Sequence, residues 1–218
     1  TPLYSSAASD VYKRQGTYNV AVGSLALDAN TTGDSNTALG YLALSANTTA
    51  SGNVAIGRSA LLANTTGVDN VGVGFSSLDA NTTGSDNTAV GDNALGANTT
   101  GTENVAIGAD ALKTATTVSA NTAVGYRALE DNAGASNTAV GDGALRENTT
   151  AANNTAVGAY ALMENTTGTY NVAVGKGAAG ANTTASNITA IGYQALDANT
   201  TGTMNTAVGT SALGANTT

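Results

Sequence analysis

The sequence predicts an all-β protein, a parallel β-solenoid (β-roll) of about twelve coils, and three observations lead to this fold class. First, a unit of seventeen residues recurs along residues 16–218, and residues 87–103 (NTAVGDNALGANTTGTE) show its typical form. Second, the fifth residue of every unit is glycine. Third, a unit this short cannot bury an apolar face alone, so it must stack on its neighbours. We number the places of each unit from one to seventeen, starting in residues 87–103 at the first asparagine.

The glycines at place five set the period of the array. Their spacing is seventeen residues except between Gly125 and Gly141, where it is sixteen. We expect two short strands in each coil. The first covers places two to four, where small or β-branched residues precede the turn glycine, and the second covers about places eight to fourteen. Each strand would pair with its equivalent one coil further on, roughly 4.8 Å away, giving a rod on the order of 55 Å long.

The expected direction of each side chain follows from alternation along a strand. Place four is Val, Ile or Leu in all twelve units, and place two is always Val or Thr, so both are expected to point inward. Place nine is Leu in all units except one, which has Ala179, and is predicted to be core. Place ten varies from Gly96 to Arg146 and is predicted to face solvent. Asparagines at places one and twelve are expected to bond in register to the next coil. The ladder at place twelve begins with Asn30, Asn47, Asn64, Asn81 and Asn98.

Place three carries the first functional prediction. It is Ala in every unit except one, which has Gly72, and alternation would put it on the outside. An outward position should vary as place ten does, so we expect this row to pack on other subunits in a homotrimer. The alternative is that Ala fits under a neighbouring turn of its own coil. The expected inter-subunit seam consists of Ala21, Ala38, Ala55, Gly72, Ala89, Ala106, Ala123, Ala139, Ala156, Ala173, Ala190 and Ala207.

Residues 1–15 share neither the period nor the composition of the array. Their last part, SSAASDVYKRQ, resembles the in-frame translation of a transposon-type sequencing-library adapter. We therefore expect residues 1–15 to be a translated sequencing artefact, typical of metagenomic DNA. Residues 16–218 are expected to be a fragment of a longer protein, with the solenoid open at both ends.

Composition disfavours several classes of function. The sequence has no His and no Cys, so it offers no imidazole or thiol for catalysis or metal binding. The carboxylates occupy scattered outward places without a recurring pair, and we expect no enzyme, no cofactor and no metal site. A net charge of −8 disfavours nucleic-acid binding, which relies on Lys and Arg. No apolar run approaches the roughly 18 residues of a membrane span.

Short motifs carry a family resemblance. NVAIG at residues 53–57 and 104–108 and NVAVG at residues 171–175 resemble the head repeats of YadA-type trimeric autotransporter adhesins. The longer unit NTAVGxxALxANTTG is similar to repeat regions of phage tail-fibre and bacterial surface proteins that end in an endosialidase-type chaperone. The resemblance implies a left-handed, trimeric, stalk-like module, located outside the bacterial cell or on a virion. The period is longer than in typical YadA-type heads.

These observations lead to two functional hypotheses. The first is a structural and attachment module of a secreted bacterial adhesin or phage tail fibre, a stiff rod that binds a host-surface glycan or protein through many weak contacts. The alternative is a monomeric ice-binding β-solenoid that presents the Thr ranks of places thirteen and fourteen. Aromatic residues at place six could stack on sugar rings or anchor protein contacts, although they fall on non-adjacent coils. They are Tyr41, Phe75, Tyr126 and Tyr193.

Overall fold

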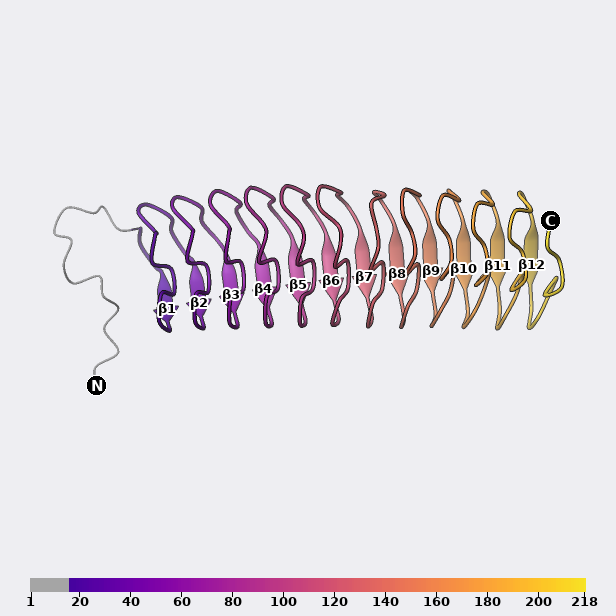
Figure 1. The fold of residues 1–218 in the computed structure, drawn as a ribbon, viewed down its shortest axis with the longest axis horizontal. Coiled ribbons are helices and arrows are strands. Elements are labelled where there is room, and N and C mark those ends of the chain that lie inside the picture. The colour runs from indigo at the N-terminus through magenta and orange to yellow at the C-terminus, as the bar shows by residue number, and fades with distance from the viewer. Residues whose placement is uncertain (1–15) are drawn as a thin grey trace.

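The computed structural model describes residues 16–218, so the predicted adapter segment, residues 1–15, lies outside the described residues. The described part contains twelve three-residue strands, which form one parallel sheet in chain order (Figure 1). We name each coil by its strand. The strands are β1 (Val20–Val22), β2 (Thr37–Leu39), β3 (Val54–Ile56), β4 (Val71–Val73), β5 (Thr88–Val90), β6 (Val105–Ile107), β7 (Thr122–Val124), β8 (Thr138–Val140), β9 (Thr155–Val157), β10 (Val172–Val174), β11 (Thr189–Ile191) and β12 (Thr206–Val208).

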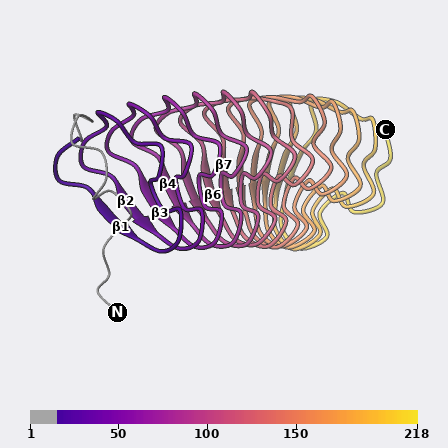
Figure 2. The same ribbon diagram turned by 60° about the vertical axis from the view of Figure 1, so that its left-hand side comes forward.

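The register of the sheet pairs equal places of successive units. Ala55 of β3 lies opposite Gly72 of β4, and the same register continues to β12. It also crosses the short unit, because Ala123 of β7 pairs with Ala139 of β8. The coils stack one after another along the long axis of the molecule (Figures 1 and 2). The predicted parallel β-solenoid is therefore confirmed.

Each coil has one strand, and the second strand predicted at places eight to fourteen is wrong. Places six to eleven instead form a continuous run of turns, which we call the turn layer. In the coil of β5, the Leu95 amide donates to Ala111 of the next coil at 2.9 Å, whereas the Ala94 amide donates to Gly91 of its own coil. Leu95 has a φ of 52°, in the left-handed region. Left-handed residues at places seven and nine prevent an extended conformation, although the layer still stacks coil on coil.

The core is a thin layer between the sheet and the turn layer. Places three, eight and nine meet there, and Ala89, Ala94 and Leu95 of one coil are all fully buried. The core position predicted for the leucines at place nine is confirmed for Leu44, Leu61, Leu78, Leu95, Leu112, Leu129, Leu145, Leu162 and Leu196.

The exceptional residue at place three illustrates how closely the two layers approach. In the coil of β4, place three is Gly72 and place eight is Ser77 instead of Ala. A Cβ atom added at Gly72 would lie 3.1 Å from the Ser77 hydroxyl oxygen. The smaller residue on the strand therefore makes room for the larger residue on the turn layer.

The glycine at place five is required by both backbone conformation and stacking. Gly91 has a φ of 139°, which side-chain-bearing residues rarely adopt. An added Cβ atom would also lie 2.5 Å from the carbonyl oxygen of Gly108 in the next coil. The equivalent glycines repeat this arrangement along the rod, which explains why the sequence marks every unit with glycine.

Two ladders of buried asparagines, at places twelve and one, connect successive coils in the segment between the turn layer and the next strand. At place twelve, the Asn98 side-chain amide donates to the Asn81 Oδ1 at 2.8 Å, and the Asn81 amide donates to Asn64 at 2.9 Å. Asn47 bonds to Asn30 at 2.9 Å in the same way. These are the hydrogen bonds expected for Asn30, Asn47, Asn64, Asn81 and Asn98, although the contact between Asn64 and Asn47 is long, at 3.4 Å.

The second ladder runs along place one. The Asn87 side chain donates to the Gly101 carbonyl at 2.8 Å, while its backbone amide donates to the Asn70 Oδ1 at 3.0 Å. Both asparagines are completely buried. Because these buried amides have partners within the chain, they avoid the cost of unsatisfied polar groups, which is about 1–3 kcal/mol each.

Candidate functional site

The alanine row at place three lies inside the chain, which corrects the prediction of an inter-subunit seam there. In the coils of β2 to β11 these residues are buried, and Ala38, Ala89 and Ala190 are 0% exposed. Ala207 in the last coil is 3% exposed, and only Ala21 in the first coil is accessible. The physical reason is the close turn layer, which leaves room for no side chain larger than Ala. The residues to which this correction applies are Ala21, Ala38, Ala55, Gly72, Ala89, Ala106, Ala123, Ala139, Ala156, Ala173, Ala190 and Ala207.

Places two and four lie on the outside, so their predicted inward direction is also wrong. Place four is partly exposed along the array, and Leu39, Ile107 and Ile191 are 46%, 39% and 39% exposed. Place two is intermediate in most coils. We call the first and third residues of strands β1 to β12 the outer sheet face. The strands that carry this face follow one another along the full length of the described array (Figure 1).

The outer sheet face carries no charged residue in any of its twelve coils. Its place-four row consists of Val, Ile and Leu only, and its place-two row of Val and Thr. A strand of three residues is about 10 Å long, so the face has a projected area of roughly 500 Å² over a rod of about 55 Å. Within this area only the place-four row is aliphatic in every coil, and a continuous exposed aliphatic row on an uncharged face is typical of an interaction surface.

The edge of this face after the turn glycine carries the place-six aromatics. Tyr41, Phe75, Tyr126 and Tyr193 are 47%, 50%, 50% and 48% exposed. The guanidinium of Arg58 lies 5.5 Å from the centre of the Phe75 ring, and that of Arg127 lies 4.9 Å from the Tyr126 ring. These distances are typical of cation–π contacts, so two of the four aromatics are already paired within the chain.

The threonines at place thirteen use their hydroxyl groups within the array. The Thr82 hydroxyl donates to the Thr99 carbonyl at 2.9 Å, and the Thr99 hydroxyl donates to the Thr116 carbonyl at 3.0 Å. The threonines at place fourteen, such as Thr100, are exposed. The two ranks therefore differ in whether their hydroxyls are free to meet a ligand.

The turn layer carries a small ionic cluster on the coils of β6 and β7. Lys113 lies 3.1 Å from the Asp110 carboxylate, and Arg127 lies 3.7 Å from Glu130. Burial alone would raise the pKa of Asp110, but hydrogen bonds from Lys113 and Asn93 lower it. These side chains are partly exposed, so the pairs contribute little to stability.

Within residues 16–218, no group of three or more His, Cys, Asp or Glu side chains is arranged to hold a metal ion. The same residues contain no helix long and apolar enough to cross a membrane. Comparison of the chain with protein-family models, with curated proteins and with solved structures finds no match.

A uniform aliphatic row is typical of a core, and for this reason the sequence pattern predicts the wrong direction for the residues of the outer sheet face. A signal for the correct direction was present at place two, which is Thr in seven of the twelve units. A row of threonines inside a thin apolar core would need a hydrogen-bond partner for every hydroxyl. The seven strands with Thr at place two have Ala at place three, which indicates the opposite arrangement, with Ala facing inward.

Proposed function

We propose that this array is a stiff rod of a bacterial surface adhesin or a phage tail fibre, and that three copies assemble through the outer sheet face. The left-handed winding and the extracellular or virion location implied by the resemblance belong to the same proposal. The observation that carries it is the unbroken aliphatic row at place four, partly exposed on a face without charges.

The composition of place four supports burial in an assembly. Places six and ten, which also face solvent, include Asp, Lys, Arg and Gly in different coils. Strand propensity alone would favour Thr as well as Val and Ile. Thr occurs at place two in seven units but at place four in none. Contact with another apolar surface accounts for this difference, because a hydroxyl would lose hydrogen bonds to water there.

The shape of the face supports a closed assembly around an axis. The outer sheet face is long and only one short strand wide, so an axis parallel to the rod brings equal coils of each chain together. Closed symmetric assemblies of this kind bury the same surface of every copy and leave no free apolar row. Three parallel chains would form a rod whose other surfaces are available for weak, repeated contacts, which add through avidity.

The mass of the full chain in solution, measured by light scattering, tests this proposal. We expect three chains for the wild type and one folded chain for a Val90→Glu, Ile107→Glu variant, because charges would be buried at the interface. The matched control is Thr100→Glu, Thr117→Glu, which adds the same charge at exposed positions in the same coils and should remain trimeric. A wild-type monomer would overturn the assembly, and a dimer would overturn its three-fold symmetry.

Ice binding is the second candidate, favoured by the regular register and the absence of charge on the outer sheet face. Equal places repeat at about 4.8 Å along the rod. This hypothesis requires the face to be free in solution. A folded monomer that shows thermal hysteresis, lost in the Val90→Glu, Ile107→Glu variant, would support it over the fibre proposal.

A further inference from the structure

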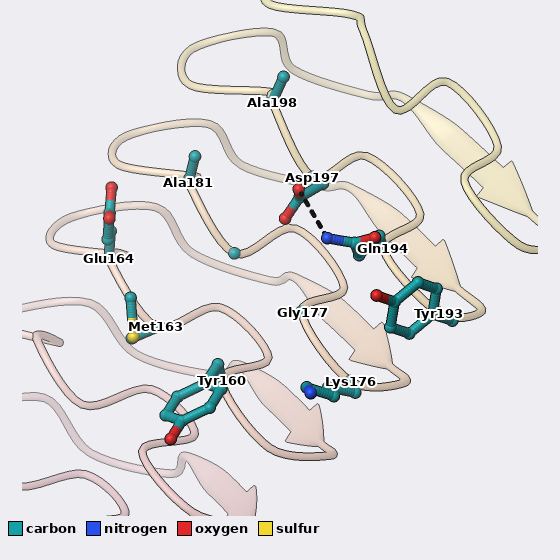
Figure 3. Close-up of a pocket in the computed structure, with 11 residues that line it drawn as sticks. Tyr160, Met163, Glu164, Lys176, Gly177, Ala181, Tyr193, Gln194, Asp197 and Ala198 are labelled. Atoms are coloured by element: carbon teal, nitrogen blue, oxygen red, sulfur yellow. Dashed lines mark hydrogen bonds between the residues drawn. The ribbon is translucent and has the colours of Figure 1, made fainter.

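A hollow crosses the turn layer near the C-terminal end of the described array. It spans the coils of β9, β10 and β11 and has a volume of about 640 Å³ (Figure 3). This volume lies within the range of small-molecule sites, and the hollow is broadly open to solvent. The hollow belongs to the turn layer, and the core separates most of it from the outer sheet face.

The hollow exists because one coil lacks side chains where its neighbours have them. At place ten, Gly180 stands between Met163 and Asp197 of the adjacent coils. At place seven, Gly177 stands between Tyr160 and Gln194. The flanking coils are two strand spacings apart, or roughly 10 Å. This leaves a trough one coil wide, enough for a single sugar ring.

Two tyrosines border this trough. Tyr160 and Tyr193 come from opposite sides of it and are 40% and 48% exposed (Figure 3). The Tyr160 hydroxyl donates to the Asp142 carboxylate at 3.0 Å and the ring leans over Gly143 of the preceding coil, so Tyr160 forms the border of the trough on the β9 side. Partly exposed aromatic rings with a fixed orientation provide apolar contact area for the C–H faces of a ligand.

Polar groups in the trough match the hydroxyl groups of a sugar. Gln194 Nε2 donates to the Asp197 carboxylate at 3.4 Å, so an amide and a carboxylate sit side by side. Such a pair offers both acceptors and donors to neighbouring hydroxyls. Glu164 and Lys176 are the other charged residues that line the trough. With two carboxylates and one ammonium, the charge of the trough disfavours an anionic ligand.

We propose that this hollow binds a neutral pyranose unit of a glycan, with the Tyr193 ring against its apolar face and the Gln194 and Asp197 pair on its hydroxyls. The inference rests on the proposed function, since it names the receptor chemistry of the attachment rod. Three chains would present three such sites, and weak sites add through avidity.

The test is a titration of the full chain with methyl glycosides of glucose, galactose, mannose and N-acetylglucosamine, followed by ligand-observed NMR. We expect saturable binding of at least one glycoside. Gly180→Met should weaken it at least about tenfold by filling the trough. The substitution is compatible with the fold, because place ten of the preceding coil is Met163. An added Cβ would lie 3.2 Å from the flexible Asp197 carboxylate and 3.3 Å from the Gly177 carbonyl oxygen.

The matched pair of controls uses place six. Tyr193→Ala should also weaken binding, whereas Tyr41→Ala removes an equally exposed tyrosine far from the hollow and should leave it unchanged. Circular dichroism establishes that each variant is folded. Absence of saturation with all four glycosides, or equal binding by the Gly180→Met variant, would overturn the site.

The experiments distinguish an error in the sugar-binding proposal from an error in the proposal of a trimeric rod. Light scattering on the same samples reports assembly independently of the sugar. A trimer without sugar binding overturns the hollow alone, and a monomer that binds sugar overturns the fibre proposal while supporting the site.

Discussion

The two adjacent rows of the strands, places three and four, have opposite environments despite being almost equally uniform in sequence. Ala89 at place three is completely buried in its own chain, whereas Ile107 at place four is 39% exposed. The uniform Ala results from a lack of space beneath the turn layer. The uniform aliphatic row has no such cause within the single chain, which is why we assign it to contact between chains. Uniformity in a repeat shows that a position is constrained, and only the geometry shows which neighbour constrains it.

The largest difference in stability is expected between two variants that place the same charge at place three and at place four. Ala89→Glu would bury a carboxylate in the core without a partner, at a cost of several kcal/mol, enough to unfold the neighbouring coils. Val90→Glu, one residue further on, puts the charge on the outer sheet face and should leave a single chain folded. Circular dichroism and urea unfolding of the two variants check this. Similar unfolding in both would contradict the difference between the rows.

A smaller effect is expected at place nine of the turn layer. Leu112→Ala should destabilise the array by about 2–4 kcal/mol, because a fully buried side chain is truncated. The natural reference is Ala179, which occupies the same place in the coil of β10. Ala179→Leu should raise the urea midpoint, since it extends the leucine row between Leu162 and Leu196. An unchanged midpoint for Leu112→Ala would refute the role of place nine as core.

A still smaller effect is expected in the asparagine ladder. Asn81→Ala removes the bonds to the Asn64 Oδ1 and the Gly84 carbonyl, each of 2.9 Å, and leaves the Asn98 amide without its Asn81 acceptor. We expect a loss of about 1–3 kcal/mol in urea unfolding. Thr100→Ala, at the exposed place fourteen, is the control and should change stability little. Equal effects of the two substitutions would show that the ladder is dispensable.

Much of the fold could be predicted from the sequence because residues at equal places of the repeat contact one another in adjacent coils. The glycine at place five, the leucine at place nine and the asparagine ladder each depend on contacts between equal places of adjacent coils, which the period defines. The register follows for the same reason, even across the short unit between Gly125 and Gly141, where the missing residue is absorbed after the strand.

The repeat period alone does not define the direction of the strand side chains, because this direction depends on the thickness of the coil. The turn layer contains leucines with positive φ, such as Leu95 at 52°. Leucine is uncommon in that region, so the sequence gives no sign of it. An Ala-Leu pattern resembles a strand, and a second strand would have permitted a thicker core with the aliphatic row inside.

The candidate sites differ in how far the sequence reveals them. The outer sheet face could have been found from the threonines at place two. The hollow depends on Gly177 and Gly180, two glycines that one coil carries at the variable places seven and ten, and its shape emerges only when Tyr160 and Tyr193 are placed on either side. The sequence shows these glycines but not the trough that they leave.

The most direct test of the outer sheet face as a seam uses spin labels, because the chain has no cysteine. Single variants Val90→Cys and Thr100→Cys of the same coil are labelled, and their assembly is checked by light scattering. We predict strong dipolar coupling between chains at Val90, abolished by dilution with unlabelled protein, and weak coupling at Thr100. Absence of coupling at Val90, or coupling stronger at Thr100 than at Val90, would contradict the assignment.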